Sequence, residues 1–349
     1  MPGKVTLKVK RNVLKDLSEN TKVIVVTGTN GKTTSCRILE EGLKKAGKSY
    51  FINKSGANLI TGVTASFIMN STITGKCKKD YAIIECDENA FKEVSRYIHC
   101  DVILVTNVFR DQLDRYGEVT HTLNAIKESV KNLPNAIVCL DADCSLTYSM
   151  SKEIPNKIIT FGVNVPFDKN AKAPEISDAK YCIFCKHEYD YTYHTYGHLG
   201  GFICPNCGYK RPQPDFAIES VEEMKNDHSV VVANLNGDRN IIRVNIGGAY
   251  NIYNAIGCAA ALTAFGIDEK TVIDAIEHFN GAFGKNGTFQ MQAIIQLILF
   301  LLKIRRLQPN YEFSLKNIDD VLPSFFRLTI MRRRQRYKLD LGRRFCRNI

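Results

Sequence analysis

Short apolar runs alternate along the chain with segments whose apolar residues recur at helical spacing. The segment from 34 to 46 has such helical spacing, and Gly47 is a suitable stop for it. This alternation predicts an α/β domain, with a mostly parallel sheet flanked by helices and built as a mononucleotide-binding core. The predicted strands are residues 22–26, 81–86, 102–106, 136–140 and 157–161.

Residues 176–214 interrupt this alternation. They contain two cysteine pairs, a stretch rich in His and Tyr, and the sequence Pro212-Gln-Pro214. We therefore interpret them as an insertion in the α/β domain. A second β-rich stretch follows, and residues 251–265 are alanine-rich with a helical periodicity that Gly266 ends.

Length and composition narrow the class of protein. With 349 residues the chain can bury a sizeable core. The first 20 residues lack the apolar run of a signal peptide, and the apolar stretch 293–302 is shorter than the roughly 20 residues that span a bilayer, so we expect a cytoplasmic protein. Twelve cysteines, scattered apart from one paired cluster, favour reduced thiols and a metal site over a disulfide framework.

The sequence Thr27-Gly-Thr-Asn-Gly-Lys-Thr-Thr34 lies between the first predicted strand and the first predicted helix. Glycines let backbone N–H groups approach phosphates, the start of a helix adds partial positive charge, Lys32 pairs with phosphate, and the Thr33 hydroxyl reaches Mg²⁺. We therefore predict that this loop binds ATP with magnesium, in preference to a glycine-rich turn that binds nothing. The predicted nucleotide-binding residues here are Thr29, Asn30, Gly31, Lys32, Thr33 and Thr34.

Two further polar positions are candidates for the same site. Glu85 ends a predicted parallel strand, at the edge where α/β sheets bind ligands and where a carboxylate suits a hard cation. Asn251 and Asn254 begin the alanine-rich helix. Taken alone, each has an alternative of similar weight: Glu85 as a solvated strand end, and the two asparagines as a helix cap and a turn.

Four cysteines in the insertion have the spacing of a metal site. Cys182 and Cys185 form one C-x-x-C pair, and Cys204 and Cys207 form a second, with 18 residues between the two pairs. Four thiolates at this spacing fit tetrahedral zinc, and the metal would supply the folding energy that so short a segment lacks. We expect a closed, structural zinc site, with the nearby histidines on the surface. Those histidines are His187, His194 and His198.

The motifs together resemble those of the Mur ligases. The loop at 27–34 has the form found in Mur ligases and folylpolyglutamate synthases, and Ile83-Ile-Glu-Cys-Asp-Glu88 resembles the family's acidic motif, which implies a magnesium-binding and catalytic role for Glu85 beside Lys32. Tyr250-Asn-Ile-Tyr-Asn254 resembles its Asn-x-x-Asn helix start near the nucleotide. Residues 106–118 are similar to a stretch of the MurT-type members, and the resemblance covers about residues 5–285.

MurT-type proteins carry a four-cysteine ribbon in a Mur-ligase middle domain and lack the N-terminal nucleotide-sugar domain of ordinary Mur ligases. The resemblance implies ATP-dependent amidation of the D-glutamate α-carboxyl in the lipid II stem peptide, through an acyl phosphate, in peptidoglycan biosynthesis. A GatD-type glutamine amidotransferase would supply ammonia as the partner in a heterodimer. Another carboxylate–amine ligase of the Mur or folylpolyglutamate type remains an alternative.

A nucleic-acid-binding zinc ribbon is the weaker alternative. Residues 181–210 offer Tyr and Phe for stacking, but Lys186 and Lys210 are their only cations, too few to follow a phosphate backbone. The charge of the whole chain agrees. Residues 288–349 hold 13 Lys and Arg against 4 Asp and Glu, so +9 of the net +11 lies there and the remainder carries +2. We therefore expect no nucleic-acid partner.

The resemblance stops after Gly284. The chain continues Lys285-Asn-Gly-Thr-Phe289, and deleting one base from a compatible set of codons gives Lys-Met-Glu-Arg-Phe, close to the family. The same shift gives family-like sequence at 303–308 and 334–345. We therefore hypothesise a nucleotide-binding domain at 1–285, with a ribbon insertion at about 176–214, and an aberrant, frameshifted tail at 286–349. The competing interpretation is a native basic tail that binds an acidic partner or a membrane surface.

Overall fold

The computed structural model describes residues 2–53, 56–109, 118–167, 179–195 and 197–280, and the backbone of residues 327–332 and 335–340. The chain divides into two compact units, residues 1–287 and 288–349. In the second unit the described part is an antiparallel hairpin of β12 (Arg327–Arg332) and β13 (Gln335–Asp340). The junction at Lys285 and Asn286, the apolar stretch 293–302 and residues 303–308 lie outside the described residues.

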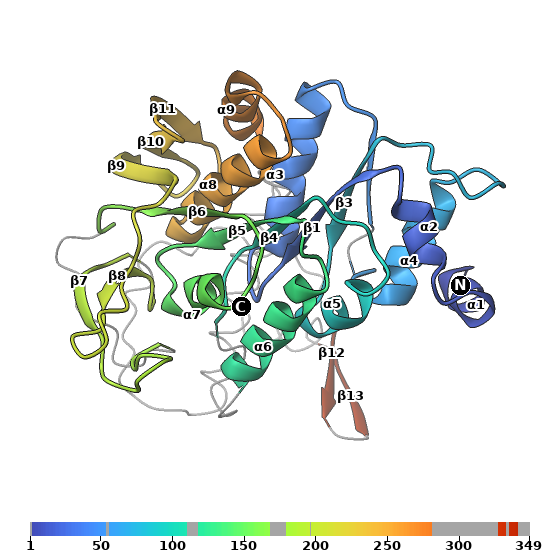
Figure 1. Cartoon of the computed structure of the whole chain (residues 1–349), viewed down its shortest axis with the longest axis horizontal. Coiled ribbons are helices and arrows are strands. Elements are labelled where there is room, and N and C mark those ends of the chain that lie inside the picture. Colours follow the sequence, from blue (N-terminus) through green and yellow to red (C-terminus); the bar gives the residue numbers. More distant parts are fainter. Residues whose placement is uncertain are drawn as a thin grey trace. The chain divides into compact units, whose positions relative to one another are not determined.

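A nine-stranded sheet forms the centre of the first unit, in the order β11-β10-β9-β6-β5-β4-β1-β3-β2 (Figure 1). The strands from β9 to β2 pair in parallel, and β10 and β11 extend the β9 edge as antiparallel strands. The bounds are β1 Lys22–Thr27, β2 Tyr50–Ile52, β3 Tyr81–Glu85, β4 Val102–Val105, β5 Ile137–Asp141, β6 Ile158–Val163, β9 Phe216–Met224, β10 Ser229–Leu235 and β11 Asp238–Val244.

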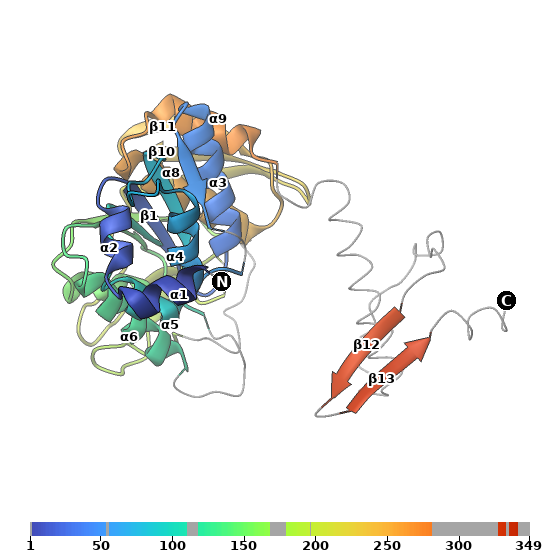
Figure 2. The same ribbon diagram turned by 90° about the vertical axis from the view of Figure 1, so that its right-hand side faces the viewer.

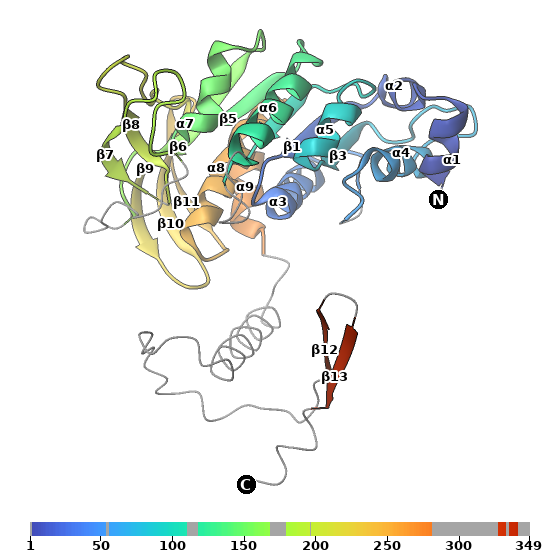
Figure 3. The ribbon, with the colours of Figure 1, turned by 90° about the horizontal axis from the view of Figure 1, so that it is seen from below.

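Helices cover both faces of this sheet (Figures 2 and 3). One face carries α3 (Lys32–Lys45), α8 (Ala249–Ala264) and α9 (Glu269–His278), and the other carries α4 (Ile60–Met69), α5 (Glu88–Val94), α6 (Glu118–Lys131) and α7 (Ser145–Ser149), followed by the short η1 (Met150–Lys152). Helices α1 (Pro2–Val9) and α2 (Val13–Ser18) pack on α4. No helix in the described ranges is long and apolar enough to cross a bilayer.

The predicted α/β architecture is confirmed, because the apolar runs are the strands of this core. Val23 to Val26 of β1 are fully buried between β3 and β4. Each predicted strand matches an observed one to within two residues at either end. The alanine-rich helix is α8, whose small side chains let it lie close to β4, β5 and β6. It ends before Gly266, which has the left-handed φ of +86°.

The insertion forms a small lobe of its own. Strands β7 (Asp190–His194) and β8 (Gly200–Ile203) pair as an antiparallel hairpin, with one cysteine pair before it and one after it. Tyr189, Phe202 and Tyr209 are buried together beside the cysteines. Figures 1 and 3 both show β7 and β8 near β6 and α7.

Candidate functional site

The glycine-rich loop leaves β1 at the carboxyl edge of the sheet and leads directly into α3. Gly28 and Gly31 have φ of +120° and +82°, a region that glycine enters at little cost. Their missing side chains matter as well, because a Cβ at Gly28 would collide with Thr106 and one at Gly31 with the side chain of Asn254. The loop is therefore packed between the end of β4 and helix α8.

Residues after β4 hold the loop by hydrogen bonds. The backbone N–H of Thr29 donates to the carbonyl of Asn107 at 2.9 Å, and that of Asn30 donates to Asn107 Oδ1 at 3.0 Å. Thr106 Oγ1 donates to the carbonyl of Asn30 at 2.7 Å. These contacts order the loop before any ligand binds.

Lys32 places a positive charge at the mouth of the loop. Its Nζ contacts the Gly28 carbonyl and lies 3.1 Å from the Thr29 carbonyl and 3.3 Å from Glu88 Oε1. Burial raises the pKa of Glu88, and the ammonium of Lys32 opposes that rise. The pair is therefore a shielded, charged group beside the start of α3, where the helix dipole also favours anions.

Thr33 and Glu85 form a pair of oxygen ligands. Thr33 Oγ1 donates to Glu85 Oε2 at 3.0 Å, and adjacent ligands of octahedral Mg²⁺ lie about 2.9 Å apart. Glu85 is only 9% exposed, so the alternative of a solvated strand end is wrong. Asn53 fixes its backbone, since Asn53 Oδ1 accepts from the Glu85 N–H at 2.8 Å and Nδ2 donates to the Glu85 carbonyl at 2.9 Å. Residues that fit magnesium are thus held in place.

Asn251 and Asn254 lie inside α8, both buried. Because the helix begins at Ala249 after Gly248, the alternative of a cap and a turn is wrong. Asn251 Nδ2 donates to the Gly247 carbonyl at 2.7 Å, and Asn254 Nδ2 donates to Asn251 Oδ1 at 3.1 Å. These two hydrogen bonds orient the Asn254 side chain so that its Oδ1 atom faces Gly31 of the phosphate loop. Thr34 is half-buried in the first turn of α3.

The four predicted zinc ligands converge. The Sγ atoms of Cys182, Cys185, Cys204 and Cys207 all lie within 4.8 Å of one another, and two of the pairs are 3.4 and 3.6 Å apart. Thiolates around tetrahedral zinc are about 3.8 Å apart, so the cluster fits that ion. Hydrogen bonds from the Asn206 side chain and the His187 backbone lower the pKa of Cys185 to about 6, which favours the ligating thiolate.

The two cysteine pairs have the same backbone geometry. The N–H of Cys182 donates to the His187 carbonyl at 2.7 Å, and that of Cys204 donates to the Tyr209 carbonyl at 2.8 Å. Lys186 and Gly208, each four residues after the first cysteine, have φ of +63° and +72°. Such paired knuckles arrange four sulfurs around one centre, with no open position for substrate.

The expectation that all three ribbon histidines lie on the surface is wrong for His198. That residue is 2% exposed, and its ring centroid lies 4.5 Å from that of Phe109. The hairpin that carries it folds back onto the body, which spacing in the sequence does not reveal. His187 is exposed and His194 is half-buried.

A second cluster, of buried charges, was not predicted. Asp143 Oδ1 accepts from Arg211 Nε at 2.6 Å, and Asp143 Oδ2 accepts from the Tyr253 hydroxyl. Burial raises the pKa of Asp143, and the Arg211 guanidinium opposes that rise. Asp143 follows β5, Arg211 lies near the end of the ribbon insertion, and Tyr253 belongs to α8, so the cluster joins three distant parts of the chain.

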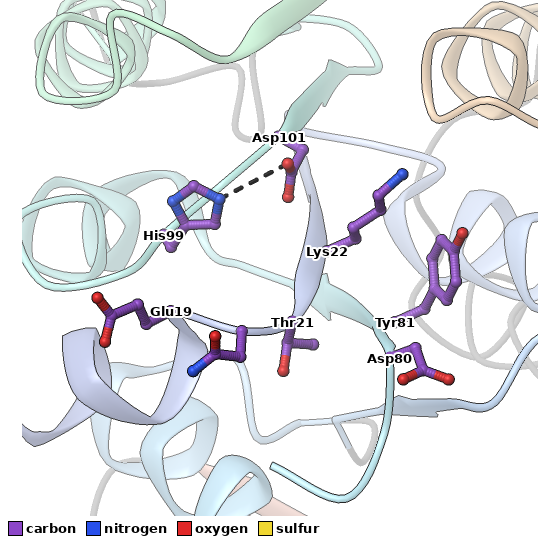
Figure 4. A pocket seen from close by; sticks show the side chains of 8 residues that line it. Glu19, Thr21, Lys22, Asp80, Tyr81, His99 and Asp101 are labelled. Carbon is purple, nitrogen blue, oxygen red and sulfur yellow. Dashed lines mark ion pairs between the residues drawn. The ribbon is translucent and has the colours of Figure 1, made fainter. Parts of the chain in front are cut away.

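A separate pocket lies at the amino ends of the parallel strands, opposite the carboxyl ends that carry the phosphate loop (Figure 4). Lys22 and Tyr81 begin β1 and β3 there, and His99 Nε2 lies 3.6 Å from Asp101 Oδ1. Ligands of α/β sheets bind at the carboxyl ends of the strands. This pocket is therefore not an extension of the phosphate loop. Residues 110–117 of the predicted MurT-like stretch lie outside the described residues.

Comparison with known proteins places this geometry in a family. Residues 26–199 match the Mur ligase middle domain. The chain is 34% identical over 291 residues to the MurT subunit of lipid II isoglutaminyl synthase (glutamine-hydrolyzing) from Streptococcus pneumoniae (strain ATCC BAA-255 / R6), covering 83% of this chain and 63% of that protein. It is 30% identical to the MurT subunit from Staphylococcus aureus (strain N315), covering 84% and 64%.

A solved structure shares the fold. The pseudomurein peptide ligase type C from Methanothermus fervidus superposes with a TM-score of 0.58 at 23% identity, over 75% of this chain and 50% of that one. The chain spans less than two thirds of the length of the MurT subunits it matches. With the matching domain, the sequence similarity and the shared fold, the chain belongs to the Mur ligase family and resembles its MurT members.

Proposed function

We propose that the chain binds ATP with Mg²⁺ at the phosphate loop. The observation that carries this proposal is the Thr33–Glu85 oxygen pair, 3.0 Å apart, beside the ammonium of Lys32 at the start of α3. The backbone N–H groups at the start of α3, from Gly31 to Thr34, and the Lys32 ammonium would bind phosphate oxygens. Thr33 and Glu85 would hold magnesium, which supplies positive charge against the β- and γ-phosphates. Asn251 and Asn254 would keep the loop against α8 and line the nucleotide.

We further propose that this nucleotide site serves the reaction named for the MurT relatives. A carboxylate oxygen of the lipid II D-glutamate would attack the γ-phosphorus, forming an acyl phosphate and releasing ADP. Ammonia from a GatD-type glutaminase would then attack the acyl carbon, forming the isoglutamine amide and releasing phosphate. Lys32 would stabilise the charge that develops on the transferred phosphoryl group. The similarity to the two MurT subunits supports this choice among ATP-dependent ligases.

The four-cysteine cluster has a structural role in this proposal. All four ligands are protein thiols and no fifth donor belongs to the cluster among the described residues. Zinc bound there would stabilise the folded insertion at about residues 176–214 within the nucleotide-binding domain of residues 1–285. It would take no part in the chemistry.

We also propose that residues from about Asn286 onward are a frameshifted translation. Sequencing the gene across the codons for Lys285 and Asn286 tests this directly, since a read that supports only the present frame contradicts it. A chain with this change would retain partial nucleotide and zinc binding while failing to amidate substrate.

The test of function compares this chain with a version whose frame is restored after Gly284. Each is mixed with lipid II, ATP, Mg²⁺, glutamine and a GatD-type partner, and ADP and isoglutamine are measured. We expect both to bind ATP and only the restored chain to form isoglutamine. If both bind ATP and neither amidates, the amidation proposal is wrong and the nucleotide site stands. A Lys32→Ala variant that retained ATP binding would contradict the nucleotide site.

A further inference from the structure

The tip of the ribbon hairpin is buried against the nucleotide-binding body. Residues 195 and 197–199 connect β7 to β8, and within them His198 and Leu199 are each 2% exposed. Gly200 N–H donates to the Asp143 carbonyl at 3.1 Å, and the hydroxyl of Tyr193 donates to the Val163 carbonyl at 2.8 Å. The ribbon is therefore seated on the body by its tip, as well as attached to it by its two ends.

One line of contacts leads from this tip to the phosphate loop through Phe109. The His198 ring lies 4.5 Å from the Phe109 ring, and the Phe109 ring is also the nearest neighbour of a Cβ built at Gly197. The backbone of Phe109 is bound to the loop at both of its polar groups: its N–H donates to Thr29 Oγ1 at 3.1 Å, and its carbonyl accepts from the same hydroxyl at 3.2 Å. Moving His198 would remove a packing partner from Phe109, one of the two residues that hold Thr29.

A second line of contacts passes through α8. The hydroxyls of Thr195 and Tyr253 lie 2.5 Å apart, and the hydroxyl of Tyr253 also donates to buried Asp143. The next residue on α8 is Asn254, whose side chain packs against Gly31. Two elements thus connect the hairpin tip to the phosphate loop, one at Thr29 and one at Gly31.

We propose that the zinc ribbon positions the phosphate loop, with His198 as a positioning residue, so that zinc occupancy sets the affinity for ATP. This inference rests on the proposed function of the loop. The buried cluster around the cysteine pairs consists of three aromatic side chains with Cys182 and Cys204, too small a core to order the two knuckles without the metal. Loss of zinc would withdraw His198 and Thr195, and with them the packing that holds Phe109 and Tyr253.

The test measures the dissociation constant of ATP with Mg²⁺ by titration calorimetry on the full chain, with zinc bound and after removal of zinc by a chelator. We expect removal of zinc to weaken ATP binding at least about fivefold, within the usual range of coupling between sites. His198→Ala should weaken it similarly with zinc bound, and zinc removal should add little further loss to this variant. His198→Phe keeps a ring against Phe109 and should restore affinity to within about twofold.

Two controls separate positioning from general loss of stability. His187→Ala removes an exposed imidazole from the same ribbon, and Leu133→Ala truncates a core residue outside the ribbon and the loop. Both should bind ATP like the parent, even where Leu133→Ala lowers the melting temperature as much as His198→Ala does. Equal ATP affinity with and without zinc would overturn the inference alone. Failure of the zinc-loaded parent to bind ATP would overturn the proposed function and the inference together.

Discussion

Gly31→Ala tests the packing that holds the start of α3. Gly31 has φ of +82°, where an alanine costs roughly 1–2 kcal/mol more than glycine. The added methyl would also collide with the Asn254 side chain and displace the hydrogen bond from Asn254 Nδ2 to Asn251 Oδ1, for a further loss of about 1 kcal/mol. We therefore expect Gly31→Ala to lower the free energy of unfolding by about 2–3 kcal/mol.

Gly266 supplies a matched control. Its φ is +86°, and a Cβ built there has no atom within 4 Å. Gly266→Ala should therefore cost the backbone strain alone, about 1–2 kcal/mol. The difference between the two substitutions measures the contact with Asn254. Only Gly31→Ala should also weaken ATP binding, by at least about tenfold, because it displaces the helix start that receives the phosphates.

A double-mutant cycle measured by urea unfolding completes the test. In an Asn254→Ala background the colliding amide is gone, so Gly31→Ala should cost no more than Gly266→Ala does. A coupling of about 1 kcal/mol between positions 31 and 254 is expected. Equal losses for Gly31→Ala and Gly266→Ala in the parent chain, with no coupling, would refute this account of the loop.

Two further substitutions test the metal sites. Glu85→Gln keeps the shape of the side chain and removes the charge that would hold Mg²⁺. Calorimetry should show the magnesium-dependent part of the ATP affinity reduced about tenfold or more, and the affinity for ATP without magnesium unchanged. An unaltered magnesium dependence would exclude Glu85 as a ligand. Cys204→Ser removes one of the four thiolates, so the zinc content measured by metal analysis should fall from one zinc per chain to well below one. The ribbon should also become sensitive to protease. Full zinc retention would contradict the four-thiolate site.

The sequence predicted those parts of the molecule whose chemistry is local. Val23 to Val26 form a continuous apolar run, so the central strand could be predicted from that run alone. The spacing of Cys182, Cys185, Cys204 and Cys207 restricts the backbone enough to predict one tetrahedral cluster, and the structure brings the four sulfurs together. The position of the phosphate loop could likewise be predicted, because the loop lies between a recognisable strand and a recognisable helix.

The rest depends on contacts between residues far apart in the chain. Asn53 fixes Glu85 from 32 residues away, and Tyr253 reaches Asp143 across 110 residues. Asn53 belongs to no motif, and Tyr253 occupies a variable position of the Asn-x-x-Asn segment, so nothing in the sequence marks either residue. The burial of His198 has the same origin, because the residue that covers it, Phe109, lies in another element. Chain folding brings these pairs together, and a single sequence carries no signal of it.

Removing the charge of Asp141 and removing that of Asp143 should have opposite effects on stability, although the two residues are neighbours. Asp141 Oδ1 accepts from the Asp143 N–H at 2.9 Å, while its Oδ2 is buried and has no hydrogen-bond partner within the described part of the chain. Burial raises the pKa of Asp141 well above its ordinary value of 3.8, and the charge of Asp143 raises it further. Asp143 instead has the Arg211 guanidinium as a partner, so it is the carboxylate that carries the charge of the pair.

The pH dependence of stability follows from these shifts. The unfolded chain loses the Asp141 proton near pH 3.8, whereas the folded chain keeps it to higher pH, so this residue lowers stability as pH rises from 3.8 toward its folded pKa. Asp141→Asn keeps the oxygen acceptor and cannot ionise. Urea unfolding should therefore give the variant the stability of the parent near pH 4 and a growing advantage as pH increases. Asp143→Asn leaves the guanidinium of Arg211 buried and unpaired, so at neutral pH it should lose about 3–5 kcal/mol. If both variants lose stability together at pH 7, Asp141 is not the strained member of the pair, and its buried oxygen has a stabilising role that the contacts of Asp141 do not account for.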